Sequence, residues 1–265
     1  MRGFGGLLRL QNGKEFMQKY HPMGSLAPRD VVARSIDHEL KISGEEFVYL
    51  DITHKDPKEV MSHFPNIYKK CLSIGIDLTK DMIPVVPAAH YCCGGIKVNL
   101  NGESSIRRLY ALGEASSTGL HGGNRLASNS MMEAAVYADA AARHAISVID
   151  SIELQRDIPA WDYEGTAVPE EMALITQDYK EMQQIMTNYV GIVRSDVRLE
   201  RAKRRLEIIF KETEELYLKS TLSQHLCELR NMIAVGYLII KQAEARHESV
   251  GLHYSIDYPA KPVEI

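Results

Sequence analysis

The chain has 265 residues, which is enough for one large domain or two small ones with real hydrophobic cores. A hydrophobic fraction of 45% and a charged fraction of 25% are ordinary for a soluble globular protein, and a net charge of -4 argues against a general nucleic-acid-binding surface. No segment is apolar enough to span a membrane and no signal peptide precedes the first element, so we expect a cytoplasmic protein. The four cysteines lack Cys-x-x-Cys spacing and disulfide-scaffold density, which favours the same compartment and predicts no metal site.

The first third of the chain mixes strand and helix patterns. Its opening Gly-Gly, apolar run and Gln-Asn-Gly turn predict a strand, a turn and a second strand over residues 5–17. Three elements are expected after them: an amphipathic helix over residues 31–43 with Pro28 near its N1 position, a buried strand over residues 46–52, and a helix over residues 58–74 that Pro65 interrupts and Gly75 ends.

The stretch from Leu109 to Glu133 is the most informative part of the sequence. After an earlier strand and a turn at Asn101-Gly102, it predicts a short strand over residues 109–112, a Gly-Glu turn, a polar glycine-rich loop and an alanine-rich helix that opens near Ser128. Such a loop brings backbone N–H groups and a helix N-terminus to a polar or anionic ligand.

From residue 159 onward the composition shifts to a turn-rich linker and then to helices. Apolar residues recur at helical spacing over residues 170–190, 195–218 and 222–245, and a polar, turn-rich segment ends the chain. Short connections between these helices predict an antiparallel three-helix bundle, so the overall fold class is α+β.

Four residues in unusual local settings are candidates for chemistry, namely Arg29, His90, Glu114 and Arg125. Each has a structural alternative: His90 a buried or turn histidine, Glu114 a cap of neighbouring backbone, and Arg125 an ion-pair partner. Two cations and a histidine beside a glycine loop nevertheless indicate a pocket for a small dianion such as a dicarboxylate, because arginine binds carboxylates through two hydrogen bonds. The adjacent Cys92 and Cys93 are either a redox pair or, as we favour, small residues in a tight strand near a ligand.

Three contiguous motifs resemble those of a known family, L-aspartate oxidase, within the succinate dehydrogenase/fumarate reductase flavoprotein superfamily, and a fourth, the last along the chain, resembles a segment of that superfamily. They are HPMGSLAPRDVVARSIDHE (21–39), PAAHYCCGGI (87–96), LYALGEASSTGLHGGNRLASNS (109–130) and RHESVGLHYSIDYP (246–259). The chain departs from the family at Val250, where arginine is usual, and it contains no glycine fingerprint for the FAD pyrophosphate.

The resemblance implies an enzyme that oxidises L-aspartate, or another C4 dicarboxylate, by hydride transfer to FAD, which oxygen or fumarate then reoxidises. The product, iminoaspartate, goes to quinolinate synthase in NAD synthesis. By the family's motifs, Arg29 is the catalytic proton donor or acceptor, and His90 and Arg125 hold the substrate carboxylates. Glu114 bonds the flavin's ribityl or ribose hydroxyls, and the backbone of Ser130 and Met131 contacts the isoalloxazine ring.

The resemblance also implies a division into three parts. Residues 1–90 correspond to the C-terminal part of a substrate-capping α+β domain, residues 91–158 to the last segment of a Rossmann-like FAD domain, and residues 159–265 to a helical domain with a polar tail. We expect a fragment of a longer enzyme, with FAD weakly bound or absent. The alternatives are a fumarate reductase or succinate dehydrogenase flavoprotein subunit, with an iron-sulfur partner and a membrane anchor, and an inactive scaffold.

Overall fold

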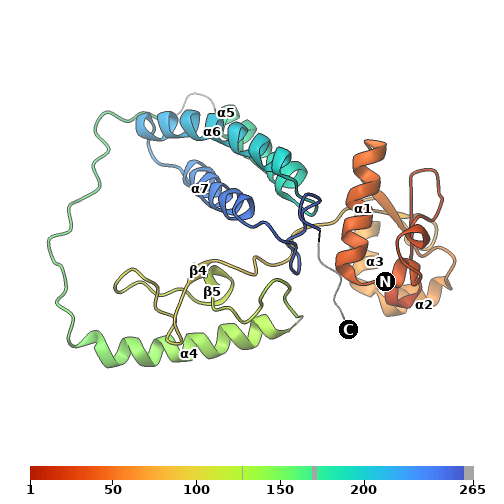
Figure 1. Ribbon diagram of the computed structural model, residues 1–265, viewed down its shortest axis with the longest axis horizontal. Coiled ribbons are helices and arrows are strands. Elements are labelled where there is room, and N and C mark those ends of the chain that lie inside the picture. The colour runs from red at the N-terminus through yellow and green to blue at the C-terminus, as the bar shows by residue number, and fades with distance from the viewer. Residues whose placement is uncertain (127, 169–171, 260–265) are drawn as a thin grey trace. The chain divides into compact units, whose positions relative to one another are not determined.

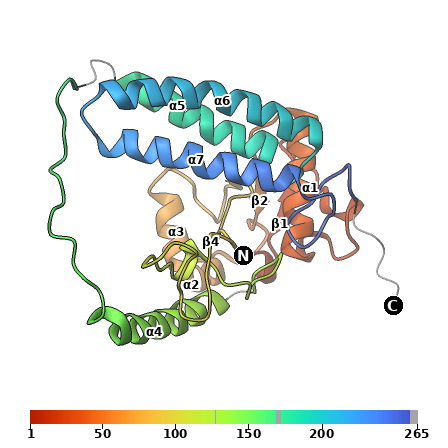
Figure 2. The same ribbon diagram turned by 60° about the vertical axis from the view of Figure 1, so that its left-hand side comes forward.

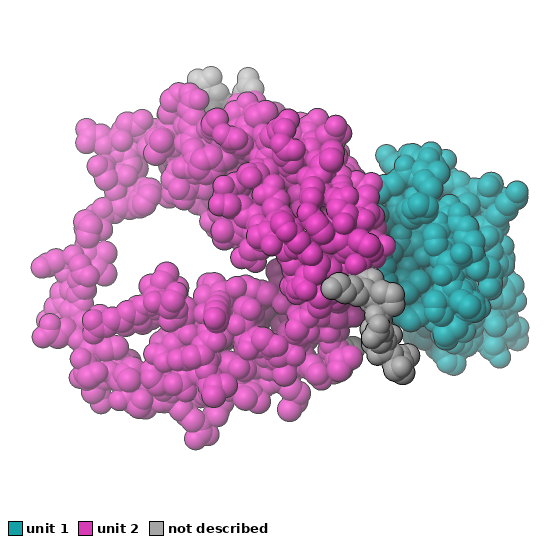
Figure 3. Space-filling view, in the orientation of Figure 1, with its two compact units in different colours: residues 1–89 teal, residues 90–265 magenta. Residues whose placement is uncertain are grey.

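The computed structural model describes residues 1–126, 128–168 and 172–259, and it has the expected α+β class (Figures 1 and 2). The chain divides into two compact units, Met1–Ala89 and His90–Ile265, which Figure 3 colours teal and magenta. Each unit is described by itself below. Across the described ranges, no helix combines the length and the apolar character that crossing a membrane requires.

A small antiparallel sheet is the centre of the first unit. Strand β2 (Val48–Asp51) lies between β1 (Leu7–Arg9) and β3 (Ile83–Val85), and Leu50 pairs with Leu8 on one side and Ile83 on the other. The predicted strand over residues 46–52 is therefore confirmed. The second strand predicted near residue 15 is wrong, because after the turn only Glu15 pairs, in a single bridge with Arg9.

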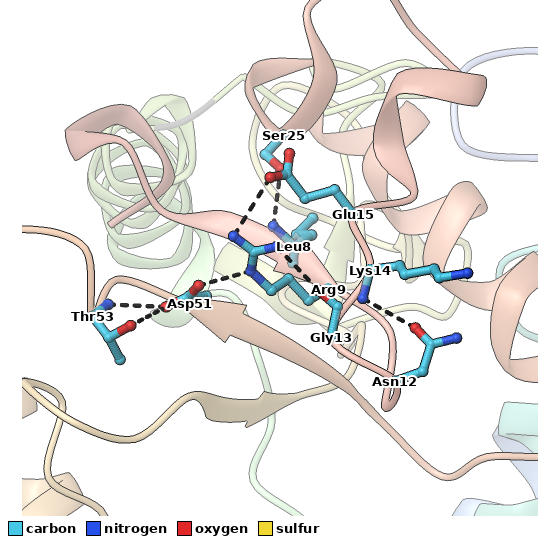
Figure 4. Close-up of polar contacts among 9 residues, drawn as sticks. All are labelled: Leu8, Arg9, Asn12, Gly13, Lys14, Glu15, Ser25, Asp51 and Thr53. Carbon is cyan, nitrogen blue, oxygen red and sulfur yellow. Dashed lines mark hydrogen bonds and ion pairs between the residues drawn. The ribbon is translucent and has the colours of Figure 1, made fainter.

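The Arg9 side chain fixes the pairing of β1 with β2. Its Nε donates to Asp51 at 2.7 Å and its Nη1 to the Gly13 carbonyl at 3.0 Å, while the Thr53 N–H and hydroxyl donate to Asp51 from the other side (Figure 4). Burial alone would raise the pKa of the Asp51 carboxyl, but the Thr53 hydrogen bonds and Arg9 outweigh it and hold that pKa below 3.8. Asp51 is therefore an ionised anchor for the strand pair.

The helices of the first unit form close to the predicted residues, although the last of them ends at Leu72 and not at residue 74. Helix α1 (Arg29–Ser43) follows Pro28, buries Val32 and Ile36, and stops at Gly44 in the left-handed conformation. The predicted break at Pro65 is confirmed, since one residue separates α2 (Pro57–His63) from α3 (Pro65–Leu72). One core joins α1 to the sheet and a second packs α2 and α3, with members Ile52, Val60, Cys71 and Leu78.

The second unit opens with a short parallel pair, β4 (Ile96–Lys97) and β5 (Ser116–Ser117), followed by the long helix α4 (Asn129–Ile149). The strand predicted over residues 109–112 is wrong, because those residues return through a tight hairpin in which only Tyr110 bridges Glu103. Small residues bring this region close to α4. A Cβ added to Gly102 or Gly113 would meet the Cβ of Ala141 at 3.3 Å or of Ala134 at 3.6 Å.

The predicted helical bundle is confirmed. Helices α5, α6 and α7 lie side by side in both ribbon views (Figures 1 and 2). Lys203 at the start of α6 pairs with Glu244 at the end of α7, and Arg230 pairs with Glu214, so these two helices run antiparallel. Ser195 and Ser223 cap them by accepting backbone hydrogen bonds. Helix α5 spans Met172–Ile185 and continues as a π-helical turn over Met186–Val190. Helix α6 spans Asp196–Lys219, and α7 spans Gln224–Glu244. The predicted start of the first of them, at residue 170, lies outside the described residues.

The segment after α7, residues 246–258, folds back onto two other parts of this unit. Its backbone pairs with Arg194, which donates to the Tyr254 carbonyl and accepts from the Ile256 N–H, both at 3.0 Å. The Arg194 guanidinium also contacts Nδ1 of His253 at 2.6 Å. Leu252 N–H donates to the Gly123 carbonyl at 2.8 Å, so the segment joins the bundle to the glycine-rich loop.

Candidate functional site

The candidate site lies in the second unit, where residues 90–93 meet the glycine-rich loop. The Cys92 N–H donates to the Glu114 carboxylate at 2.9 Å. Glu114 sits in a 3₁₀ turn, and Gly113 enables that turn by adopting a φ of 61°. The exposed Glu114 side chain keeps free surface for further donors while it holds the segment after His90.

The Tyr91 ring links residues 90–93 to Arg125. The Arg125 guanidinium lies over the ring, 4.6 Å from its centroid, and Nη1 donates to the Ser130 hydroxyl at 3.1 Å. Burial, followed by the charges of Glu133 and Glu114, raises the pKa of the Tyr91 hydroxyl. Tyr91 is therefore neutral, and Arg125 is oriented by an aromatic ring and by the first turn of α4.

A buried carboxylate lies directly behind these residues. Glu133 accepts a hydrogen bond from the Thr118 hydroxyl, and its Oε2 lies 2.7 Å from Nε2 of His121. The side chains of Glu133 and His121 are 2% and 7% exposed. His121 also contacts Tyr91 edge-on, with ring centroids 5.7 Å apart. Sequence reasoning missed this cluster, although a threonine and a histidine three residues apart, followed by a glutamate early in a helix, were its signal.

A small hollow opens beside this cluster. Backbone and side chains of the loop and of the β5 strand line it, together with Glu133: the lining residues are Cys93, Ser116, Ser117, Thr118, Gly119, His121, Gly122 and Glu133. Nδ1 of His121 is buried and has no hydrogen-bond partner within the described part of the chain. The hollow thus combines hydroxyl-bearing side chains, glycine residues and a histidine whose Nδ1 lacks a described partner.

Helix α4 begins at this site with no side-chain cap. Ser128, at the N-cap position, has a φ of 72° and its hydroxyl accepts no capping hydrogen bond. An uncapped N-terminus presents backbone N–H groups and the positive end of the helix dipole to an acceptor. Ser130 lies in this first turn beside Arg125, whereas the Met131 side chain is 76% exposed on the helix surface.

Arg29 lies in the first unit, exposed in the first turn of α1. The segment before it is held by Arg2, which donates to the carbonyls of Ser25 at 2.9 Å and Ala27 at 3.1 Å. Burial and then the neighbouring Arg29 charge lower the pKa of Arg2. Sequence reasoning missed Arg2, because an arginine followed by glycine carries no periodic signal.

The structure therefore brings part of the predicted site together. Arg125 and Ser130 contact each other, Arg125 lies against the residue next to His90, and Glu114 bonds the residue after that. Arg29 belongs to the other unit, so its convergence with His90 and Arg125 stays a prediction.

Comparison with known proteins assigns both ends of the chain. Residues 1–131 match the FAD binding domain family, and residues 179–262 match the fumarate reductase flavoprotein C-terminal family. The chain is 47% identical to the L-aspartate oxidase of Pseudomonas aeruginosa, covering 98% of this chain and 48% of that protein. It is 48% identical to the enzyme of Yersinia pestis, with 98% and 49% covered.

Solved structures of flavoproteins share the fold. A quinol-fumarate reductase with menaquinol molecules superimposes with a TM-score of 0.80 at 27% identity, covering 99% of this chain and 52% of the other. Mycobacterium smegmatis Sdh1 in complex with UQ1 gives a TM-score of 0.77 at 30% identity, with 98% and 46% covered.

The fold and the two family matches place the chain among the flavoproteins of the fumarate reductase class. Within that class the chain belongs to the L-aspartate oxidase family. It spans about half the length of the curated relatives that it matches.

Proposed function

We propose that the gene product that contains this chain oxidises L-aspartate to iminoaspartate, with FAD as the hydride acceptor. The observation that carries the proposal is the 47% identity to an L-aspartate oxidase across 98% of the chain, against 27% and 30% for the fumarate reductase and Sdh1 structures. The polar loop and its cations supply chemistry that suits a four-carbon diacid.

Three cationic or titratable side chains handle the substrate in this proposal. Arg125 binds one carboxylate through two parallel hydrogen bonds, because its planar guanidinium is already oriented by Tyr91 and Ser130. His90 binds the other carboxylate from the adjoining segment. Arg29 exchanges the proton that accompanies hydride transfer, the role that the resemblance implies for it. Its place in the first turn of α1, where a cation opposes the helix dipole, favours an anionic partner beside it.

The residues on the chain fit FAD on three observations. Glu114 offers an exposed carboxylate to ribityl or ribose hydroxyls, α4 offers an uncapped N-terminus, and His121 holds a buried nitrogen without a partner in the described residues. The cofactor, when bound, supplies the electron sink that accepts the hydride. The backbone of Ser130 and Met131 at the start of α4 would stabilise negative charge on the reduced ring.

We further propose the division into a capping part at residues 1–90, an FAD-binding part at residues 91–158 and a helical part at residues 159–265. The division into compact units at residues 89 and 90 supports the first boundary, and the two family matches, one ending at residue 131 and the other beginning at residue 179, support a separate helical part. We place the enzyme in the cytoplasm, with oxygen or fumarate as electron acceptor and with quinolinate synthase using its product.

A fumarate reductase or succinate dehydrogenase flavoprotein is the second candidate function. The TM-score of 0.80 with a quinol-fumarate reductase and the match of residues 179–262 to the fumarate reductase flavoprotein family favour it. The two candidates differ in substrate, since this one acts on succinate or fumarate and predicts an iron-sulfur partner and a membrane anchor.

The test is to purify the gene product that contains this chain, record its flavin spectrum, and add L-aspartate or succinate without oxygen. We expect L-aspartate to bleach the flavin and succinate to leave it oxidised. Bleaching by succinate alone would overturn the substrate assignment in favour of the second candidate. A preparation that takes up no flavin even when FAD is supplied supports the inactive scaffold instead.

Arg125→Lys keeps the charge but loses the paired hydrogen bonds, so it should weaken L-aspartate binding.

A further inference from the structure

We propose that Glu133 is a positioning residue for the substrate-binding side chains, acting through His121 and Tyr91 on Arg125 and His90. The inference rests on the proposed function, because it takes Arg125 and His90 as the residues that hold the substrate carboxylates. It assigns a role to a buried cluster that none of the family's motifs explains.

The first step is the environment of Glu133. A buried carboxylate is costly unless its oxygens are paired, and here each oxygen has a partner, Thr118 on Oε1 and His121 on Oε2. Both partners belong to the glycine-rich loop, while Glu133 belongs to α4. The carboxylate therefore ties the loop to the helix whose first turn also carries Ser130.

The second step is the orientation of the His121 ring. Its Nε2 contacts Glu133 at 2.7 Å, whereas its Nδ1 has no hydrogen-bond partner among the residues that the structure describes. Among the described residues, the contact with Glu133 is therefore the polar contact that fixes which way the ring faces. In that orientation the ring meets Tyr91 at an interplanar angle of 90°, which is a favourable arrangement of two aromatic rings.

The third step passes from Tyr91 to the substrate-binding residues. Arg125 lies over the Tyr91 ring at 4.6 Å, so a displacement of that ring displaces the surface on which the guanidinium rests. His90 precedes Tyr91 in the chain, and the next residue, Cys92, is fixed by Glu114. One ring therefore couples both proposed carboxylate-binding side chains to the buried Glu133.

The experiment uses the FAD-loaded gene product that contains this chain and measures succinate binding by calorimetry, with the flavin spectrum recorded in the same samples. Glu133→Gln keeps the size of the side chain but loses its charge, and His121→Leu removes the polar contact. We expect each to weaken succinate binding by about tenfold or more and to raise KM for L-aspartate with little change in kcat. Asp139→Asn makes the same chemical change on the exposed surface of α4, where Asp139 pairs with Arg143, and should leave succinate binding unchanged.

Tyr91 provides a pair of variants that separates positioning from folding. Tyr91→Phe keeps the ring and should bind succinate like the unaltered protein, whereas Tyr91→Leu should bind it as weakly as Glu133→Gln. Thermal unfolding identifies any variant that is not folded, and the two Tyr91 variants still decide the matter if Glu133→Gln unfolds. Succinate binding within about twofold of normal in folded Glu133→Gln or Tyr91→Leu protein would overturn the inference. Failure of the proposed function is distinct, because succinate would then bleach the flavin of the unaltered protein.

Discussion

Gly251→Ala tests how the segment after α7 holds the glycine-rich loop. Gly251 has a φ of +60°, and a Cβ placed there would lie 2.3 Å from the carbonyl oxygen of Gly123 and 2.4 Å from its carbonyl carbon. These are backbone atoms, so the side chain cannot be accommodated by rotating a neighbour. The substitution must move one backbone away from the other and stretch the hydrogen bond from Leu252 N–H to Gly123, now 2.8 Å.

The expected cost combines two terms. A left-handed conformation costs a non-glycine residue roughly 1 kcal/mol, and the lost hydrogen bond contributes about another 1 kcal/mol. A total of about 2 kcal/mol corresponds to roughly 30-fold more frequent local opening. The three atoms nearest to the added Cβ all belong to Gly123, so the loss is expected first at the contact between the segment and the loop.

Amide hydrogen exchange measures this opening directly at Leu252. Gly165→Ala is the matched control, because Gly165 also has a positive φ, +80°, but has open space where its Cβ would lie. Gly251→Ala should accelerate exchange at Leu252 by about 30-fold, and Gly165→Ala should leave that amide unchanged. Equal protection of Leu252 in both variants would refute the close backbone contact and the reasoning built on it.

Three further predictions concern the second unit. Leu226 is fully buried in the bundle, so Leu226→Ala should lower the free energy of unfolding by about 3 kcal/mol, measured by denaturant titration, whereas Leu218→Ala on the exposed surface should change it by less than about 0.5 kcal/mol. Ser223→Ala removes the cap of α7 and should cost about 1 kcal/mol in the same titration. Burial and then the Arg194 charge lower the pKa of His253 below 6.5, so the folded state disfavours its protonation. The stability that His253 contributes is fully present above pH 6.5 and should be lost as the pH falls through its pKa in the folded state. His253→Asn should flatten that part of the plot of unfolding midpoint against pH.

The helices were predictable because their signals are local. The start of α1 after Pro28, the break at Pro65 and the long helix from Asn129 each follow from residues within a turn of the boundary. The spacing of apolar residues likewise predicted the bundle, because each helix shows a buried face in its own sequence.

The errors have two sources, which are local backbone conformations that composition does not reveal and contacts between residues distant in the sequence. Leu109–Leu112 has the composition of a strand, but Arg108 and Gly113 both adopt positive φ, and the stretch closes a hairpin instead. The cluster of Thr118, His121 and Glu133 was missed for the second reason. Its members contact one another across 12 to 15 residues of loop and helix, and no periodic pattern records such contacts.

The contacts of Arg194 predict the effect of truncating the chain after α7. Its backbone and guanidinium bond the chain at Tyr254, Ile256 and His253, all of which come after the last helix. A stop codon just after residue 245 would preserve α5, α6 and α7 and still remove these bonds. The half-buried Arg194 guanidinium would then have to bind water instead. It would also remove the hydrogen bond from Leu252 to Gly123, so the loss of these last residues should loosen the loop that leads into α4.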